Sequence, residues 1–428
     1  MQKKVGQSLK RKDNIAVKCL IISVFTSGLT TFVFNGSAFD VFAYTFFIIY
    51  FVFNIGNLLW AKFIWIHIAL IISSLVAISL LNLSYSRFVL TILPIIVIYS
   101  CVYTIIYRRS NVTELFELYV KFALYTAIFG LIQYFASLVG INLHNELKGR
   151  INSVAGEPSH YASILLPAVS YTFFHLKRYK IQFSIFLVTL FLTYNLTGYI
   201  VFILIIATSY LNPFYYVFSL AIVNYFLFNI LPAFNDNFRD RILDTKSALD
   251  NGVDVISMDL NVNGTTLSMF SNIDVTKDVL HQSPILGCGL GGHPDMYFRH
   301  FENSPFRYNY YFGLNANAAH SLTIRIFSEL GYLGGAIYVF IMLKALFISR
   351  LNKNRPIILA CLSHFFCKTL KLGSYIDFGT PFFFCMLVYC LFDKPILKKI
   401  WKKGTAKMSA GGHINRPPAI IAESEPHR

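Results

Sequence analysis

Apolar runs of about twenty residues recur along most of this chain, and they narrow the possible folds more than any other feature. Residues 15–34 and 63–82 are two examples, and each is long enough to cross the hydrocarbon core of a bilayer, which is about 30 Å thick. Hydrophobic residues make up 55% of the chain and charged residues only 14%, unlike a soluble globular domain. The sequence therefore predicts an all-α, polytopic integral membrane protein.

The length and apolarity of these runs predict about twelve transmembrane helices. Little more than Asn195 to Gly198 separates the seventh run from the eighth, so the count changes by one if these two runs form a single span. The predicted spans are residues 15–34, 39–57, 63–82, 88–107, 119–139, 160–176, 181–196, 198–211, 214–233, 319–346, 356–370 and 375–392.

Positive charge on this chain is placed in a way that indicates topology rather than nucleic-acid binding. The formal net charge is +16, and the basic residues gather in the tails and in short connections between apolar runs. That is the pattern of cytoplasmic loops, and with an even number of spans all the clusters fall on one side. No nucleic-acid partner is expected. The clusters are Lys3/Lys4/Lys10/Arg11/Lys12, Arg108/Arg109, Lys177/Arg178/Lys180, Arg350/Lys353/Arg355 and Lys394/Lys398/Lys399/Lys402/Lys403.

This topology places two segments on the outer side of the membrane and both termini in the cytoplasm. The tail after Thr405 is rich in Gly, Pro and polar residues, which predicts disorder. The predicted layout is a basic tail (1–14), nine spans (15–233) with a short external loop (141–159), a large external loop (234–318), three spans (319–392) and a basic, disordered tail (393–428).

Several familiar catalytic patterns do not occur in the sequence. It has no P-loop, no GxSxG nucleophile elbow, no HExxH and no paired-Asp metal cluster. Six of the seven cysteines fall in apolar runs, where they behave as small hydrophobic residues, and Cys288 is alone in the large loop. Neither a metal ion nor a cofactor is therefore expected.

The short external loop carries a dense group of polar residues. Pro158 suits the first turn of a helix that begins at Ser159 or just before it, which places Glu157 at the helix N-terminus and His160 about one turn in. One interpretation is an interfacial cap with Arg150 reaching the membrane surface. The other is that Arg150 binds an anion while Glu157 or His160 handles protons.

Residues 284–335 are the most informative part of the chain. The first half contains His293 and four glycines, which predict a loop. The second half predicts a membrane helix with His320 at its entrance and with Arg325 and Glu329 one turn apart inside it. Charge within a membrane helix marks a functional site, although a purely structural ion pair is the alternative.

Other arginines of the large loop are weaker candidates. Arg239 and Arg241 lie among aspartates in what is expected to be a solvated helix, and one of them could face a substrate. Arg299 lies near a run of tyrosines, which form either an interfacial belt or a surface for stacking sugar rings. External arginines and histidines suit an anionic, membrane-bound substrate such as a lipid diphosphate, because arginine binds phosphate oxygens and Glu or His can accept a proton.

Three segments carry a resemblance to a known family: GRINSVAGEPSHYA, SMFSNIDVTKDVLHQSPILGCGLGGHP and NANAAHSLTIRIFSELGYLGG. Together they resemble the O-antigen and capsular polysaccharide polymerases of the O-antigen polymerase/ligase superfamily. The likeness covers the two external loops and the following helix, about a third of the chain. It departs from the family at Ser271-Asn272, where many members have an arginine, and in the alanine-rich NANAAHS.

The resemblance implies a metal-independent glycosyltransferase at the periplasmic face of the bacterial inner membrane. Its substrate would be an undecaprenyl-diphosphate-linked oligosaccharide, and its partners would include a chain-length regulator and a flippase. An O-antigen ligase acting on lipid A-core and a non-catalytic transporter of lipid-linked glycans are the alternatives. The resemblance matches Arg150, Glu157, His293, His320, Arg325 and Glu329 to the family's motifs. Together with the reading of the loops, it leads us to expect Arg150, Glu157, His320 and Arg325 as catalytic residues and His160, Arg239, Arg241, His293, Arg299 and Glu329 as substrate-binding residues.

Overall fold

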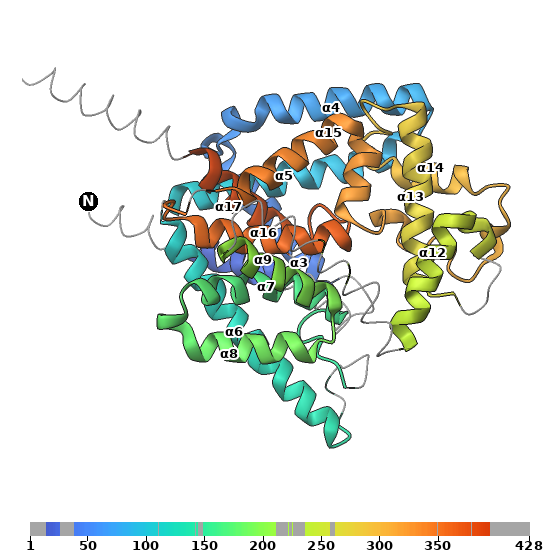
Figure 1. Ribbon diagram of the computed structural model, residues 1–428. Coiled ribbons are helices and arrows are strands. Elements are labelled where there is room, and N and C mark those ends of the chain that lie inside the picture. Colours follow the sequence, from blue (N-terminus) through green and yellow to red (C-terminus); the bar gives the residue numbers. More distant parts are fainter. Residues whose placement is uncertain are drawn as a thin grey trace, which may run out of the picture.

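A computed structural model describes residues 14–25, 38–109, 111–141, 143, 149–210, 221, 225, 236–256, 262–348, 350–377 and 379–393. Every regular element in these ranges is helical, as predicted. An unlabelled helix, Asn14–Phe25, comes first. The labelled helices of Figure 1 are α3 (Ala38–Asn54), α4 (Trp60–Leu81), α5 (Tyr85–Arg109), α6 (Val112–Leu138), α7 (Pro158–Phe174), α8 (Leu176–Leu192), α9 (Leu196–Tyr210), α12 (Asp236–Ile256), α13 (Gly264–Gln282), α14 (His293–His300), α15 (Leu322–Leu346), α16 (Arg355–Leu370) and α17 (Thr380–Val388). The shorter turns of helix are η1 (Ile55–Asn57), η3 (Pro305–Tyr308), η4 (Ala316–Ala318) and η5 (Tyr389–Asp393).

Four of these helices are long and apolar enough to cross a membrane among the residues described: α4 (from Ile64), α5, α6 and α15. Their outward faces carry large exposed hydrophobic side chains, such as Trp65, Leu90 and Phe135. Exposed apolar side chains on helices of this length suit lipid rather than water. The structure therefore suggests a multi-pass membrane protein.

The predicted number of twelve spans is wrong. Most predicted spans coincide with a helix to within a few residues, but α7 and α8 have 17 residues, α16 has 16 and α9 has 15. At about 1.5 Å per residue, such helices fall short of a hydrocarbon core about 30 Å thick. An apolar run that forms a buried helix reads in sequence like one that crosses lipid. The predicted span 214–233 lies mostly outside the described residues.

Helices α7 and α16 form the centre of the molecule. They pack directly against each other, and nearly every side chain of both is buried, including Leu165 and Val169 of α7 and Leu359 and Leu362 of α16. Because these helices are covered on all sides by protein, they need no alternation of polar and apolar residues. The packing of this pair therefore holds the N-terminus of α7 and the C-terminus of α16 in fixed positions.

Helices α12, α13 and α14 lie together at one side of the molecule, on the right in Figure 1. Helix α13 packs against α15, and α14 contacts both α13 and α15. Arg299 of α14 donates hydrogen bonds to the carbonyls of Leu81 (2.8 Å) and Asn82 (3.1 Å), which satisfies the open C-terminal end of α4. The late loop is thus largely helical and is fastened to the ends of the spanning helices.

Candidate functional site

The N-terminus of α7 forms as the sequence predicted. Glu157 is the N-cap residue, Pro158 occupies the first helical position and His160 follows within the first turn. Glu157 Oε2 accepts hydrogen bonds from Ser159 Oγ (3.0 Å) and Lys371 Nζ (3.3 Å). Burial raises the pKa of Glu157, but Lys371, His160 and the Ser159 hydrogen bond together hold it below its usual value. Glu157 is therefore an anion at neutral pH.

A strained turn presents His320 beside this group. Asn315, Ala319 and His320 all have positive φ angles, of 60°, 50° and 59°, which non-glycine residues rarely adopt. Ser321 then caps α15 by accepting a hydrogen bond from the backbone N–H of Ile324. Strained backbone of this kind concentrates at functional sites, where the surrounding structure holds it in place.

The hydrogen bonds around His320 favour one tautomer. Its Nδ1 lies 3.2 Å from Ser268 Oγ, and the single hydroxyl proton of Ser268 is directed at the carbonyl of Leu314. Nδ1–H therefore donates to Ser268, and Nε2 carries the lone pair without a hydrogen bond to any described residue. Burial, followed by the nearby charge of Lys371, lowers the pKa of His320 to about 4. At neutral pH this ring is uncharged and can accept a proton.

Arg325 and Glu329 pair one turn deeper in α15, as predicted. Arg325 Nε donates to Glu329 Oε1 at 3.1 Å, and Arg325 Nη1 donates to the carbonyl of Gly373 at 3.4 Å. The guanidinium carbon also lies 4.5 Å from the centre of the Tyr375 ring. Glu329 is fully buried, whereas Arg325 is 8% exposed. Among the described residues nothing accepts a hydrogen bond from Arg325 Nη2, so one edge of the fork is available to a ligand.

Helix α15 is interrupted just after this pair, and the glycine-rich loop fills the interruption. Gly331 has φ 62° and ψ −163°, which breaks the helix. The N–H groups of Cys288 and Gly289 donate to the carbonyls of Ser328 (2.8 Å) and Glu329 (2.9 Å). On the far side of the break, Tyr332 N–H donates to the carbonyl of Pro284 at 2.8 Å. Irregular backbone at such depth is stable only when protein satisfies it, and this loop does so.

Glycine is required where this loop meets the helix. A Cβ atom at Gly287 would lie 2.3 Å from the carbonyl oxygen of Ser328, and one at Gly331 would lie 2.3 Å from that of Ile285. Both residues also have positive φ angles, of 68° and 62°. The glycines that predicted a loop therefore serve a close approach of backbone to backbone, which holds α15 and its charged pair in position.

The last turn of α16 and the connection that follows it supply two cations that the sequence analysis missed. Lys371 follows α16 directly, and Gly373 lies so close to the strained turn that a Cβ there would be 1.5 Å from the carbonyl oxygen of Ala318. Lys368 is fully buried, and its Nζ donates to the carbonyl of Ser374 and to Thr380 Oγ1, both at 2.6 Å. The available signal was a lysine inside the apolar run 356–370, which is as informative as Arg325 in its own run.

The structure brings together five of the predicted residues with these lysines. Glu157 bonds Lys371, His160 Nε2 lies 3.9 Å from Glu157 Oε2, and His320 lies close enough to Lys371 for its pKa to respond. Arg325 reaches Gly373 in the same connection, with Glu329 behind it. We call this the outer cluster: Glu157, His160, His320, Arg325, Glu329, Lys368 and Lys371.

The other predicted residues lie elsewhere. Arg150 donates to the carbonyls of Thr193 and Tyr194, both at 3.1 Å, in the turn between α8 and α9. His293 is buried between Ser328 Oγ (2.7 Å) and Asn272 Oδ1 (2.9 Å), so it joins α14, α15 and α13.

Three further arginines of the large loop had been predicted to bind substrate. Arg299 holds the end of α4, as described above. Arg239 is exposed on α12, and the side chain of Arg241 lies outside the described part of the structure.

The outer cluster combines two chemical abilities. Arg325 Nη2 and Lys371, whose side chain is 31% exposed, can bind phosphate oxygens, and neutral His320 can accept a proton. In the described ranges, no three His, Cys, Asp or Glu side chains gather closely enough to hold a metal ion. No protein-family model matches this chain, and no curated protein matches it either.

Proposed function

We propose that the protein is a bacterial O-antigen or capsular polysaccharide polymerase, a glycosyltransferase acting at the periplasmic face of the inner membrane. It would join oligosaccharide repeat units that are carried on undecaprenyl diphosphate. The observation that carries this proposal is the outer cluster: the buried Arg325 reaches the carbonyl of Gly373 in the connection that begins with Lys371, and neutral His320 lies near Lys371. The resemblance of the three sequence segments supports the same reaction.

Binding of the donor substrate would place its diphosphate against Arg325 and Lys371. Arginine binds phosphate oxygens through two parallel N–H groups, and a mostly dehydrated guanidinium does so more strongly than one in water. Lys371 Nζ lies 3.3 Å from Glu157 Oε2, and its flexible side chain can turn from this carboxylate to the phosphate within the cluster. Glu329 fixes the orientation of the guanidinium from behind.

Transfer would follow as a displacement at the anomeric carbon. The hydroxyl oxygen of an acceptor repeat unit attacks that carbon, and the bond from the carbon to the diphosphate oxygen breaks. The hydroxyl proton passes to Nε2 of His320, which is uncharged at neutral pH. The charge that develops on the departing diphosphate is stabilised by Arg325 and Lys371.

This proposal revises one role that the resemblance implied. Arg150 is engaged by two backbone carbonyls at the turn between α8 and α9, so Lys371 takes the phosphate-binding role expected of it. Arg150 instead orders the segment that leads into α7 and thereby positions Glu157. A chain-length regulator and a flippase remain the expected partners, with both termini in the cytoplasm.

A transporter is the second candidate, because α15 is a broken helix among the possible membrane spans. Broken membrane helices bind substrates in many transporters, because the helix ends expose unpaired backbone groups. In this protein the break at Gly331 is filled by its own glycine-rich loop, whose backbone bonds the carbonyls of Ser328 and Glu329. Those backbone groups are therefore occupied, which favours catalysis at the outer cluster over transport through the break.

The test is the pattern of surface glycans in cells that lack the gene, compared with complemented cells. Loss of the polymer ladder with a single repeat unit retained supports the polymerase. Loss of all repeats from lipid A-core, with long chains still on the lipid carrier, would assign the protein as a ligase instead. An unchanged ladder would contradict both enzymes. In the complemented cells, Arg325→Ala should behave like the deletion, and Arg178→Ala is its matched control, because it removes an exposed arginine of α8 that pairs with Glu117.

A further inference from the structure

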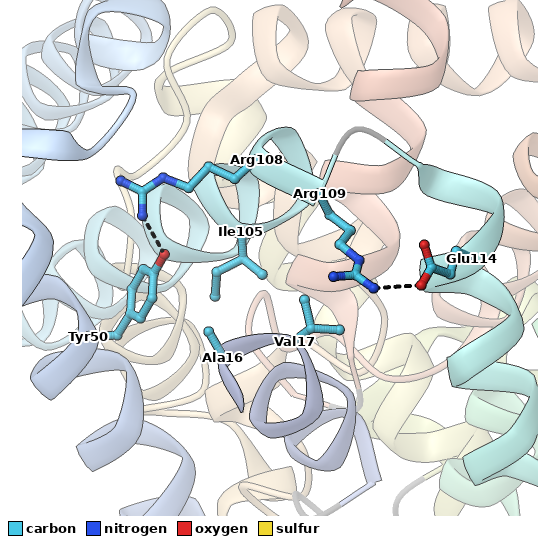
Figure 2. A pocket seen from close by; sticks show the side chains of 7 residues that line it. All are labelled: Ala16, Val17, Tyr50, Ile105, Arg108, Arg109 and Glu114. Atoms are coloured by element: carbon cyan, nitrogen blue, oxygen red, sulfur yellow. Dashed lines mark hydrogen bonds and ion pairs between the residues drawn. The ribbon is translucent and has the colours of Figure 1, made fainter. Parts of the chain in front are cut away.

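A pocket lies at the end of α5 that is remote from the outer cluster (Figure 2). Its volume is about 340 Å³, and its lining comes from the helix Asn14–Phe25, from α3 and from the junction of α5 with α6. The opposite end of α5 carries Arg87, which is paired with Asp295 of α14 at 2.9 Å. Since α5 has 25 residues, at about 1.5 Å each, the two ends are separated by about the thickness of a membrane.

Two neighbouring arginines form opposite sides of this pocket (Figure 2). Arg108 and Arg109 are the last residues of α5, and consecutive side chains on a helix point about 100° apart. Arg108 Nη1 lies 3.3 Å from the hydroxyl of Tyr50 on α3, whereas Arg109 Nη2 pairs with Glu114 Oε1 at 2.5 Å. The two guanidinium groups therefore spread apart and leave a hollow between them.

The hollow combines net positive charge with an apolar wall. Two arginines and one glutamate line it, which leaves one net positive charge, and Ala16, Val17 and Ile105 form the apolar side. Arginine binds the oxygens of phosphate groups in pairs, and an aliphatic wall suits the carbon skeleton attached to such a group.

We propose that the pocket binds a phosphate ester, and that its physiological occupant is the headgroup of an anionic membrane lipid. Basic pockets between membrane helices on the cytoplasmic side bind such headgroups, and the basic clusters of this sequence place the pocket on that side. The lipid phosphate would lie between Arg108 and Arg109, with its glycerol against Val17 and Ile105. This inference is independent of the proposed glycosyl transfer.

A bound lipid would join three separate parts of the chain. Arg109 Nη1 already donates to Asn14 Oδ1 at 2.6 Å, and Arg108 reaches Asn54 Oδ1 of α3 at 3.4 Å. A phosphate between the arginines would therefore hold the first helix, α3 and the α5–α6 junction together. A ligand that binds only the folded state raises the melting temperature, and at a given concentration a tighter ligand raises it more.

The test uses the full-length protein purified in a neutral detergent, with its melting temperature measured against added lipid. Phosphatidylglycerol is expected to raise the melting temperature by several degrees, phosphatidylcholine to have little effect, and inorganic phosphate to act only at much higher concentration. In the double variant Arg108→Gln/Arg109→Gln, apparent affinity for phosphatidylglycerol should fall at least tenfold. Arg178→Gln is the matched control, because Arg178 is an exposed arginine paired with Glu117 outside the pocket.

A second variant tests the hollow itself without removing either arginine. Ala16→Leu keeps every charge and fills the hollow, so it should also weaken binding of phosphatidylglycerol at least tenfold. Equal stabilisation of wild type and both variants by phosphatidylglycerol would overturn the proposal. Equal effects of inorganic phosphate and phosphatidylglycerol at the same concentration would overturn the assignment to a lipid.

Discussion

The two ends of the spanning helices hold their basic side chains in different ways. At the outer cluster, Arg325 is 8% exposed, pairs with a fully buried glutamate and rests on the Tyr375 ring. At the other end, Arg108 and Arg109 line an open hollow and contact side chains at its rim. A buried arginine stays charged, so the groups around it must include an anion. An exposed basic residue at the end of a span needs no such partner, because its position reflects the orientation of the chain in the membrane. Substitutions should therefore have much larger effects at the outer cluster.

The largest effect is expected from Arg325→Ala. It leaves Glu329 buried without its partner, which should lower the free energy of unfolding by about 3–5 kcal/mol. It should also abolish the glycan polymer, because the phosphate-binding fork is lost.

The double variant Arg325→Met/Glu329→Leu separates these two effects. An apolar pair of similar volume should restore the folded protein, as measured by thermal unfolding in detergent, without restoring polymer. Polymer at wild-type length from this variant would mean that the ion pair is structural only.

The next largest effect is expected at the break in α15. Gly331→Ala adds a methyl group 2.3 Å from a backbone carbonyl oxygen at a φ of 62°, which should lower the free energy of unfolding by about 3 kcal/mol or more. Gly56→Ala is the control, because a Cβ there meets nothing within 4 Å. Similar melting temperatures for the two variants would show that the glycine-rich loop does not hold α15.

Lys371→Ala should reduce polymer synthesis more than it reduces stability. Loss of one cation that stabilises a departing diphosphate is expected to slow the reaction about 10²- to 10³-fold. The side chain is 31% exposed, so the loss of its ion pair with Glu157 should cost at most about 1 kcal/mol of unfolding free energy. Lys277→Ala, which removes a surface ion pair with Asp274, is the control. An equal rate for the two variants would remove Lys371 from the mechanism.

The buried histidine predicts a pH dependence of stability. Because the pKa of His320 is lowered to about 4 in the folded state, the unfolded chain binds more protons between pH 6.5 and about 4. Stability should therefore be fully present above pH 6.5 and fall as the pH drops through this window, by up to about 3 kcal/mol from this group. His320→Gln should flatten the decline, whereas His281→Gln at an exposed position should not. Parallel pH profiles of melting temperature in both variants would contradict a neutral, buried His320.

The smallest effect is expected at the lipid pocket. Without added lipid, Arg108→Gln/Arg109→Gln should lower the free energy of unfolding by about 1 kcal/mol or less, because the ion pair that is lost, between Arg109 and Glu114, is near the surface. The loss should shrink further in high salt, since screening weakens exposed pairs. A loss as large as that of Arg325→Ala would mean that the two ends do not differ in the way described above.

Local chemistry allowed parts of this structure to be predicted from the sequence. Pro158 located the start of α7, and the i,i+4 spacing of Arg325 and Glu329 predicted their pairing. The features that the sequence did not predict depend on contacts between residues far apart in the chain. No local pattern indicates that Arg150 bonds a turn some forty residues away, or that the glycine-rich loop enters α15. Buried helices such as α7 and α16 differ from a membrane-spanning helix mainly in length. Helix ends are the least certain part of a prediction, so the number of spans could not be predicted reliably.

Reconstitution of the transfer reaction tests the central claim most directly. The purified protein in lipid vesicles would be given an undecaprenyl-diphosphate-linked repeat unit, and products would be resolved by length together with released undecaprenyl diphosphate. The wild type should form chains of two or more repeats with one carrier released per linkage, and the folded Arg325→Met/Glu329→Leu variant should form none. Folded wild-type protein that yields only single repeats and releases no carrier would contradict the account.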